Sequence, residues 1–238
     1  MKKYLYLNVN GFQGIEEKKK ENLNSEECKK TAKIICERIY NLNSYDAIFF
    51  SEFDPNSDTG KYVKDYFERK GYNLILPNNC SEIAGNFYSV VVAFVRKELN
   101  ISHSEPSPAN WLTFCELKID DYHIVGIHST RDSFLDALKQ KLGNNKEKNW
   151  IIIGDTNVSS LSERKRQEII ESIGTEILDK AHEFTFKNYT KIDRVFVRAN
   201  DENRFNGMEL NVIKGFYNVS LNEALSDHDA LELKIPCN

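Results

Sequence analysis

Five short patches of acidic, amide-bearing or histidine residues recur along this chain, each at or near the end of a strand-like hydrophobic run. They read Asn-Val-Asn-Gly at 8–11, Ser-Glu at 51–52, Gly-Asp-Thr-Asn at 154–157, Lys-Ile-Asp-Arg at 191–194 and Ser-Asp-His at 226–228. A polar side chain that ends a strand lies at the rim of its sheet. Five such ends at one rim would gather oxygen ligands suited to a hard divalent cation. With a histidine beside the cation, the set predicts metal-assisted hydrolysis of a phosphodiester.

The elements that must position these patches follow from the spacing of apolar residues. Apolar runs such as Ala-Ile-Phe-Phe at 47–50 are typical of strands buried on both faces, whereas apolar steps of three and four residues predict helices. Gly71 is expected to end the second helix, and Asp120 and Asp121 to form the turn of an antiparallel pair. Strands are predicted at 4–9, 46–51, 73–76, 89–95, 111–118, 122–128, 150–154, 183–187, 192–198, 209–214 and 230–235, and helices at 25–42, 59–70, 131–142 and 160–173.

This order of elements predicts the architecture. Many strands with a few interspersed helices favour an α/β or α+β sandwich, in which two sheets lie face to face and helices cover the outside. The alternation is too irregular for a barrel of eight equal units. The sequence contains no linker, internal repeat or low-complexity segment, so residues 1–238 are expected to form a single domain.

Charge and hydropathy set bounds on the partners. The net charge is −4, so no global basic field indicates a nucleic-acid-binding protein, although a carboxylate-rich metal site is itself acidic. Nothing approaches the roughly 18 consecutive apolar residues of a membrane span. The apolar stretch after Met1 is too short and too broken for a signal peptide, so a cytoplasmic protein with no membrane partner is expected.

The cysteines give no sign of a zinc site. The chain has five of them and no CxxC pair: Cys28, Cys36, Cys80, Cys115 and Cys237. Buried, reduced thiols are therefore expected.

Taken in order, the patches NxNG, SE, GDxN, IDR and SDH resemble the endonuclease/exonuclease/phosphatase superfamily, which has the deoxyribonuclease I-like fold. The resemblance extends over nearly the whole chain, from Asn8 to Ile235. It implies a four-layer sandwich of two face-to-face mixed β-sheets flanked by helices, and cleavage of phosphoester bonds with Mg²⁺ or Mn²⁺. One departure is Thr156, which stands where the family usually has an aromatic residue.

The resemblance also implies a set of metal ligands. Glu52 matches the family's primary ligand, Asn8 lies near the metal, and Asp227 is a further ligand. Asn10 takes a second position, where some members have Asp, and would contact the substrate. Taken alone, the two asparagines are more often turn formers.

The catalytic roles are carried over in the same way. Asp155 would orient or deprotonate the attacking water, and Asn157 would hold a phosphate oxygen or the metal. His228 would contact the scissile phosphate and handle a proton, because the pKa of a histidine is near neutrality. Asp193 would fix and polarise His228, as an orienting carboxylate does in a catalytic triad.

Further substrate contacts are implied beside these residues. His128 stands where the deoxyribonuclease I-like branch has a phosphate binder or general acid. Because the abasic-site repair branch typically has a Tyr at this position, His128 argues against a role in abasic-site repair. Tyr88 and Asn86 match minor-groove contacts, although an aromatic at a strand edge is at least as plausible. Arg131 could contact phosphate, whereas Arg194 is expected to form a structural salt bridge, since it points opposite to Asp193 in an alternating strand.

These expectations define the predicted function. The chain is expected to be a Mg²⁺-dependent phosphodiesterase and a nuclease, with DNA ranked ahead of RNA and a monomer as the default. In-line attack of an Asp155-activated water would cleave the bond. The alternatives are an enzyme of the same fold acting on a nucleotide second messenger, inositol phosphate or phospholipid head group, and a non-catalytic binding protein.

Overall fold

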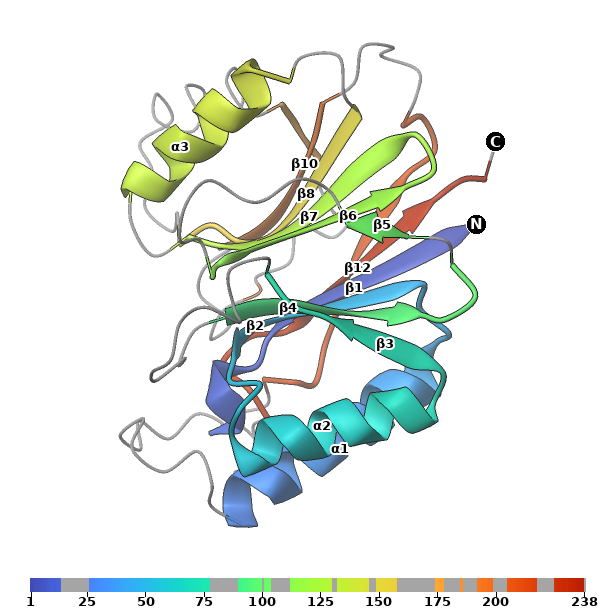
Figure 1. Cartoon of the computed structure of the whole chain (residues 1–238), viewed down its shortest axis with the longest axis vertical. Coiled ribbons are helices and arrows are strands. Elements are labelled where there is room, and N and C mark those ends of the chain that lie inside the picture. The colour runs from blue at the N-terminus through green and yellow to red at the C-terminus, as the bar shows by residue number, and fades with distance from the viewer. Residues whose placement is uncertain are drawn as a thin grey trace.

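A computed structural model of the chain contains two mixed β-sheets that lie face to face (Figure 1). It describes residues 1–13, 26–77, 90–99, 101–103, 112–129, 132–145, 149–157, 174–177, 185, 192–198, 205–217 and 225–237. The first sheet runs, edge to edge, β11 (Glu209–Ile213), β12 (Ala230–Ile235), β1 (Lys2–Asn8), β2 (Ala47–Phe53), β4 (Val90–Arg96) and β3 (Tyr72–Ile75). The second runs β5 (Ser102–His103), β6 (Phe114–Ile119), β7 (Tyr122–His128), β8 (Asn149–Asp155), β10 (Asp193–Arg198) and β9 (Thr175–Ile177).

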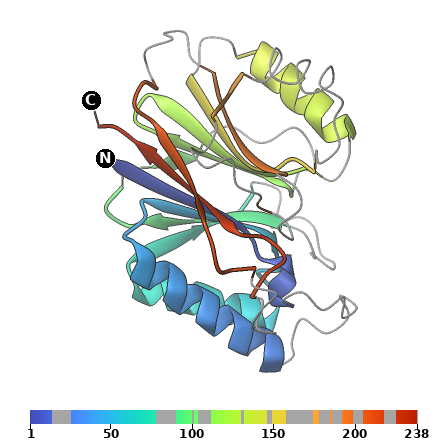
Figure 2. The same cartoon turned by 180° about the vertical axis from the view of Figure 1, so that it is seen from behind.

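Helices cover the outer face of each sheet. Helices α1 (Glu26–Leu42) and α2 (Asp58–Arg69) lie under the first sheet, and α3 (Asp132–Gly143) lies over the second (Figures 1 and 2). A short 3₁₀ turn, η1 (Asn10–Phe12), follows β1. The predicted four-layer sandwich of the deoxyribonuclease I-like fold is therefore confirmed.

Local signals explain where the helices begin and end. The buried side of α1 carries Cys28, Ala32, Ile35 and Ile39 at helical spacing. Helix α2 begins after Ser57, whose side chain accepts a hydrogen bond from the Gly60 N–H at 2.9 Å, as an N-cap does. It ends before Gly71, which adopts a φ of 87°.

The core has two apolar layers on the first sheet because its strands are covered on both faces. In β2, Phe49 packs between the sheets, whereas Ile48 and Phe50 pack towards the helices. Facing Phe49 across the interface is Gly126 of β7, where a Cβ atom would collide with the phenyl ring. This glycine therefore permits the close approach of the two sheets.

The register of the strands brings all five patches to one end of the sandwich, here called the rim. Strands β1 and β2 are parallel, with Asn8 opposite Ser51, and β7 and β8 are parallel, with His128 opposite Asp155. Strand β10 is antiparallel to β8 and begins at Asp193, opposite Asp155. Because β12 is antiparallel to β1, the segment before its first residue also lies at the rim.

Most predicted elements are confirmed, with boundaries that differ by a few residues. The predicted antiparallel pair is β6 and β7, with Asp120 in the left-handed region at the turn. Strands β5 and β9 and the η1 turn were not predicted, because two or three residues carry no readable period. The predicted helix at 160–173 lies outside the described residues, as does the strand at 183–187 apart from Thr185.

Cysteine burial agrees with the prediction at three positions and differs at one. Cys28, Cys36 and Cys115 are buried free thiols, whereas Cys237 is exposed. The expectation of burial is wrong for Cys237 because this residue follows the last strand. Cys80 lies outside the described residues. None of the helices in the described part is long and apolar enough to cross a membrane.

Candidate active site

Glu52 reaches the rim through an irregularity in β2. The pairing of β2 with β4 shifts register between Phe50 and Phe53, and Glu52 adopts a φ of 52° inside that bulge. A left-handed conformation at a residue other than glycine costs on the order of 1 kcal/mol or more and is characteristic of functional sites. The strand thus departs from regular geometry at the residue that the sequence predicts to be the primary metal ligand.

Asn8 connects the carboxylates of the two sheets. Its Nδ2 donates to Glu52 Oε1 at 3.1 Å and to Asp155 Oδ2 at 3.2 Å. Its Oδ1 accepts the backbone N–H of Asn10 at 3.0 Å. Asn8 therefore lies at the predicted metal site, with its amide nitrogen between the two acidic groups.

His128 is buried beside the same two carboxylates. Its Nε2 lies 3.5 Å from Glu52 Oε1 and 3.8 Å from Asp155 Oδ2. The imidazole ends β7, next to Asp155 at the end of β8. The structure therefore brings Glu52, Asn8, Asp155 and His128 together, as the sequence predicts.

Asn157 closes a tight turn after β8. It adopts a φ of 51°, and its backbone N–H donates to Asp155 Oδ1 at 2.8 Å. Its side-chain Nδ2 donates to the carbonyl of Ser129 at 2.6 Å, so the carboxamide is fixed in orientation. Gly154, the first residue of the Gly-Asp-Thr-Asn patch, lies within β8. A Cβ atom there would collide with the Ile127 carbonyl of the neighbouring strand.

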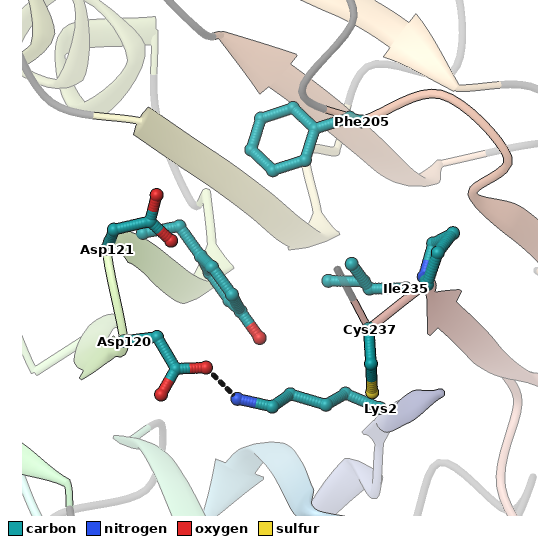
Figure 3. Close-up of a pocket in the computed structure, with 8 residues that line it drawn as sticks. Lys2, Asp120, Asp121, Phe205, Ile235 and Cys237 are labelled. Atoms are coloured by element: carbon teal, nitrogen blue, oxygen red, sulfur yellow. Dashed lines mark hydrogen bonds and ion pairs between the residues drawn. The ribbon is translucent and has the colours of Figure 1, made fainter.

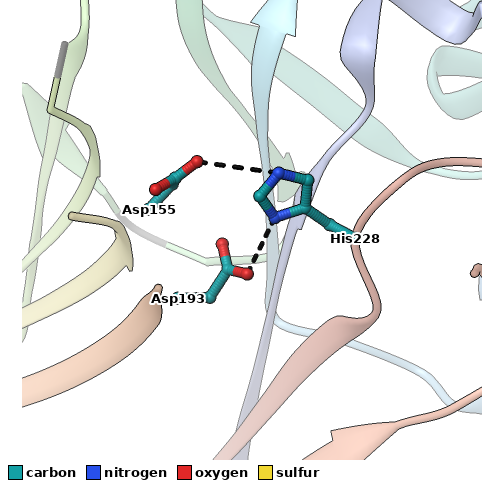
Figure 4. A group of neighbouring side chains, drawn as sticks. All are labelled: Asp155, Asp193 and His228. Atoms are coloured by element: carbon teal, nitrogen blue, oxygen red, sulfur yellow. Dashed lines mark hydrogen bonds and ion pairs between the residues drawn. The ribbon is translucent and has the colours of Figure 1, made fainter. Parts of the chain in front are cut away.

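Three buried groups from different segments meet at the second sheet (Figure 4). His228 Nδ1 lies 2.8 Å from Asp193 Oδ2, and because an ionised carboxylate only accepts, Nδ1 donates. His228 Nε2 lies 3.7 Å from Asp155 Oδ2 and 3.9 Å from Asp227 Oδ1. The predicted pair of Asp193 and His228 is therefore present, and the second ring nitrogen of His228, Nε2, faces the rim carboxylates.

Burial and charge move the pKa values of this group. Burial, and then the negative charge of Asp193, raise the pKa of Asp155 to about 7, against a smaller opposing effect of His228. Burial disfavours the His228 imidazolium, but the charge and hydrogen bond of Asp193, together with the charges of Asp155 and Asp227, outweigh it and raise its pKa to about 9. The prediction of a His228 pKa near neutrality is wrong. His228 carries a positive charge at pH 7, and Asp155 is the group that titrates near neutrality.

Without metal, the wild type is expected to lose stability relative to Asp155→Asn as the pH rises. The pKa of Asp155 is raised from 3.8 to about 7, so the stability contributed by its protonated form is present below pH 4 and lost through pH 7. Between pH 5 and 7.5 the wild type should lose about 2 kcal/mol relative to the variant. Denaturation in EDTA at both pH values measures this, and parallel pH profiles for the two proteins would contradict it.

Two side chains that the sequence left without a role hold the site together. Ser226 Oγ donates to the Asn8 carbonyl at 2.6 Å and accepts the His228 N–H at 3.1 Å. Asp229 Oδ1 accepts the backbone N–H groups of residues 215, 216 and 217 at 3.0 to 3.1 Å. Ser226 begins the Ser-Asp-His motif and Asp229 follows it, so their proximity to His228 was the only available signal.

The chemistry of the rim suits a divalent cation. Two imidazoles lie there beside four carboxylates, which belong to Glu52, Asp155, Asp193 and Asp227. Within the described part of the chain, buried Asp193 Oδ1 has no hydrogen-bond partner. Asp155, Asp193 and His228 lie close enough to share an ion, but a protonated His228 cannot ligate. Oxygens of Glu52 and Asp155 are therefore the better ligands for a hard cation.

Some predicted contacts lie outside the described residues. These are Tyr88 and Arg131, together with Asn86. Asn10 is described and follows the metal-site strand with a φ of 44°.

A separate cavity of about 170 Å³ lies at the opposite end of the sandwich (Figure 3). Lys2 and Asp120, which line it, form an ion pair, and aromatic and aliphatic groups make up part of the wall. Its lining residues are Lys2, Asp120, Asp121, Tyr122, Phe205, Ile235, Pro236 and Cys237. Strands β1 and β7 separate this cavity from the rim, so it shares no residue with the candidate site.

Comparisons with known proteins agree with the architecture. No family model and no curated protein matches this sequence. A D. rerio TDP2 humanised by 14 mutations is 14% identical, with a TM-score of 0.63 over 98% of this chain and 97% of that chain. An AP endonuclease from Archaeoglobus fulgidus is 15% identical, with a TM-score of 0.64 over all of both chains. Staphylococcus aureus beta toxin is 15% identical, with a TM-score of 0.66 over 99% and 100%.

Proposed function

Because the chain has the deoxyribonuclease I-like fold of the endonuclease/exonuclease/phosphatase superfamily, we propose that it is a Mg²⁺- or Mn²⁺-dependent phosphodiesterase acting on nucleic acid, DNA ahead of RNA. One observation carries the proposal. Carboxylates from both sheets meet two buried imidazoles at a single rim, with Asp155 Oδ2 within 3.8 Å of each Nε2 atom. Structural carboxylates are usually neutralised by nearby bases, whereas this group has an excess of acids.

Glu52 and Asp155 would hold the cation, with Asn8 and Asp227 at its margin. When bound, the cation would neutralise charge on the phosphate and on the leaving oxygen. The residues fit this role for two reasons. Asp155 is acidic enough to ionise near neutrality, and carboxylate oxygens of Glu52 and Asp155 both lie within 3.2 Å of Asn8 Nδ2. A cation would favour the ionised form of Asp155.

Asp155, kept ionised by the cation, would take a proton from the attacking water as a general base. The water oxygen forms a bond to phosphorus as the opposite P–O ester bond breaks. Positively charged His228, held by Asp193, stabilises the added negative charge, and Asn157 contacts a phosphate oxygen. The products are a phosphate monoester and an alcohol, and by family resemblance a 5′-phosphate and a 3′-hydroxyl.

The remaining residues would bind substrate and leaving group. His128 would act as the general acid for the departing oxygen, a role consistent with its position beside Glu52 and Asp155. Asn10, Tyr88 and Arg131 stay predicted substrate contacts. In a small-molecule phosphodiesterase the same chemistry would act on a different ester, and the net charge of −4 favours that alternative.

The test is cleavage of supercoiled plasmid, linear duplex, single-stranded DNA and RNA with Mg²⁺ or Mn²⁺, beside an EDTA control. We expect the wild type to cleave a polymer and EDTA to abolish this cleavage. Glu52→Gln should weaken both the cleavage and the affinity for Mn²⁺, which calorimetry measures. Metal binding without polymer cleavage would transfer the proposal to a small phosphoester. The absence of both metal binding and cleavage would indicate a non-catalytic protein.

A further inference from the structure

The hydroxyl group of Tyr6 crosses the interface between the two sheets. Tyr6 lies in the middle of β1 and is 1% exposed. Its hydroxyl oxygen lies 2.7 Å from Ser51 Oγ in the first sheet and 2.9 Å from the Ile127 carbonyl in the second. It also accepts the backbone N–H of Asp155 at 3.0 Å. One oxygen atom thus connects β1, β2, β7 and β8.

Each of these contacts adjoins a group of the candidate site. Ser51 precedes Glu52, Ile127 precedes His128, and the third partner is the backbone of Asp155 itself. Tyr6 is two residues before Asn8, whose amide bridges the carboxylates of Glu52 and Asp155. The hydroxyl therefore lies directly behind the rim and fixes the backbone from which the candidate metal ligands extend.

We propose that Tyr6 is a positioning residue, whose hydroxyl holds the rim ends of the two sheets at the separation that the metal site requires. The inference rests on the proposed function and deepens it. Without this hydroxyl, a buried N–H of Asp155 and a buried carbonyl of Ile127 each lose a partner. These groups must then move to find new partners or water, and the movement would alter the spacing of Glu52 and Asp155.

The same strand provides a matched control. Tyr4 is two residues earlier, faces the same interface, is buried, and pairs its hydroxyl with that of Tyr122 in β7. This second cross-sheet contact lies towards the end of the sandwich away from the rim. Tyr4→Phe and Tyr6→Phe therefore remove the same chemical group from the same layer of the core, but only Tyr6→Phe removes one behind the site.

The experiment compares Tyr4→Phe and Tyr6→Phe in the full chain by three measurements. These are the Kd for Mn²⁺ by calorimetry, kcat and KM for the preferred phosphodiester, and stability in denaturant. Tyr6→Phe is expected to weaken Mn²⁺ binding and lower kcat by about 10- to 100-fold, with little change in KM. Tyr4→Phe should lose stability while its Kd and kcat stay within about twofold of the wild type.

Two outcomes would overturn the inference. Wild-type Kd and kcat in Tyr6→Phe would show that the hydroxyl does not position the site, and equal losses in both variants would show a general effect of the core. If Tyr6→Phe does not fold, Ser51→Ala removes one partner of the hydroxyl and should give a smaller loss of Mn²⁺ affinity and kcat. Unchanged Mn²⁺ affinity and kcat in Ser51→Ala would also contradict the inference about Tyr6. A wild type that neither binds Mn²⁺ nor cleaves any ester refutes the proposed function, whereas an active wild type with a normal Tyr6→Phe refutes the Tyr6 inference alone.

Discussion

Replacing Asp155 with asparagine is expected to lower kcat by about three orders of magnitude. The substitution keeps the size of the side chain and an oxygen for the Asn157 N–H, but removes the base and one negative charge of the metal site. Single-turnover cleavage of the preferred phosphodiester at saturating Mn²⁺ measures the effect. Mn²⁺ affinity should fall as well, because Asp155 contributes one of the two carboxylates that Asn8 bridges.

Asp46 provides the control for that substitution. Its Oδ2 accepts the Lys3 N–H at 2.7 Å, so it is a carboxylate in a structural hydrogen bond of the first sheet, at the end of β1 away from the rim. Asp46→Asn should retain the kcat of the wild type. A reduction of less than about tenfold in Asp155→Asn would mean that this residue is not the base.

Removing either member of the Asp193 and His228 pair should have the next largest effect. His228→Ala is expected to lower kcat by about 10²- to 10³-fold, because it removes a cation that Asp193 keeps protonated. Asp193→Asn should cost a similar factor, since the imidazole loses both its orientation and its charge. Because the two residues act as one unit, the double variant should be little worse than either single variant.

His123 is the matched control for His228. It is also a buried histidine with a carboxylate partner, since its Nδ1 lies 2.7 Å from Glu116 Oε1, but that glutamate pairs with Lys141 of α3, away from the rim. His123→Ala should lose stability without losing kcat per folded molecule. Additive losses in the double variant of Asp193 and His228 would show that the two residues act separately.

The fold could be predicted from the sequence because its signals are local and repeated. Continuous apolar runs identified β2 and β8 as strands buried on both faces, and Ser25 to Leu42 showed the period of a helix. The polar residue that ends each run predicted the rim. What placed Glu52, Asp155 and His228 together was the parallel pairing of β1 with β2 and of β7 with β8, together with the antiparallel pairing of β12 with β1.

Other features depend on contacts that no local pattern encodes. Tyr6 reads in the sequence as an ordinary apolar strand residue, and only the packing of one sheet on the other gives its hydroxyl three partners. The pKa of His228 depends on burial and on Asp193, 35 positions away along the chain. A glycine is needed at position 154 because a Cβ atom there would collide with a carbonyl on the adjacent strand.

The pairing of β1 with β12 has a consequence for biosynthesis. Lys2 lies opposite Ile235, so β1 completes its hydrogen bonds with a strand made more than 200 positions later. His228 belongs to the segment that leads into that late strand. A nascent chain therefore has neither the full first sheet nor the complete group of reactive side chains until residues 226–235 have left the ribosome. The candidate site would then be assembled in one late step, after the segment that carries His228 has joined strands made long before it.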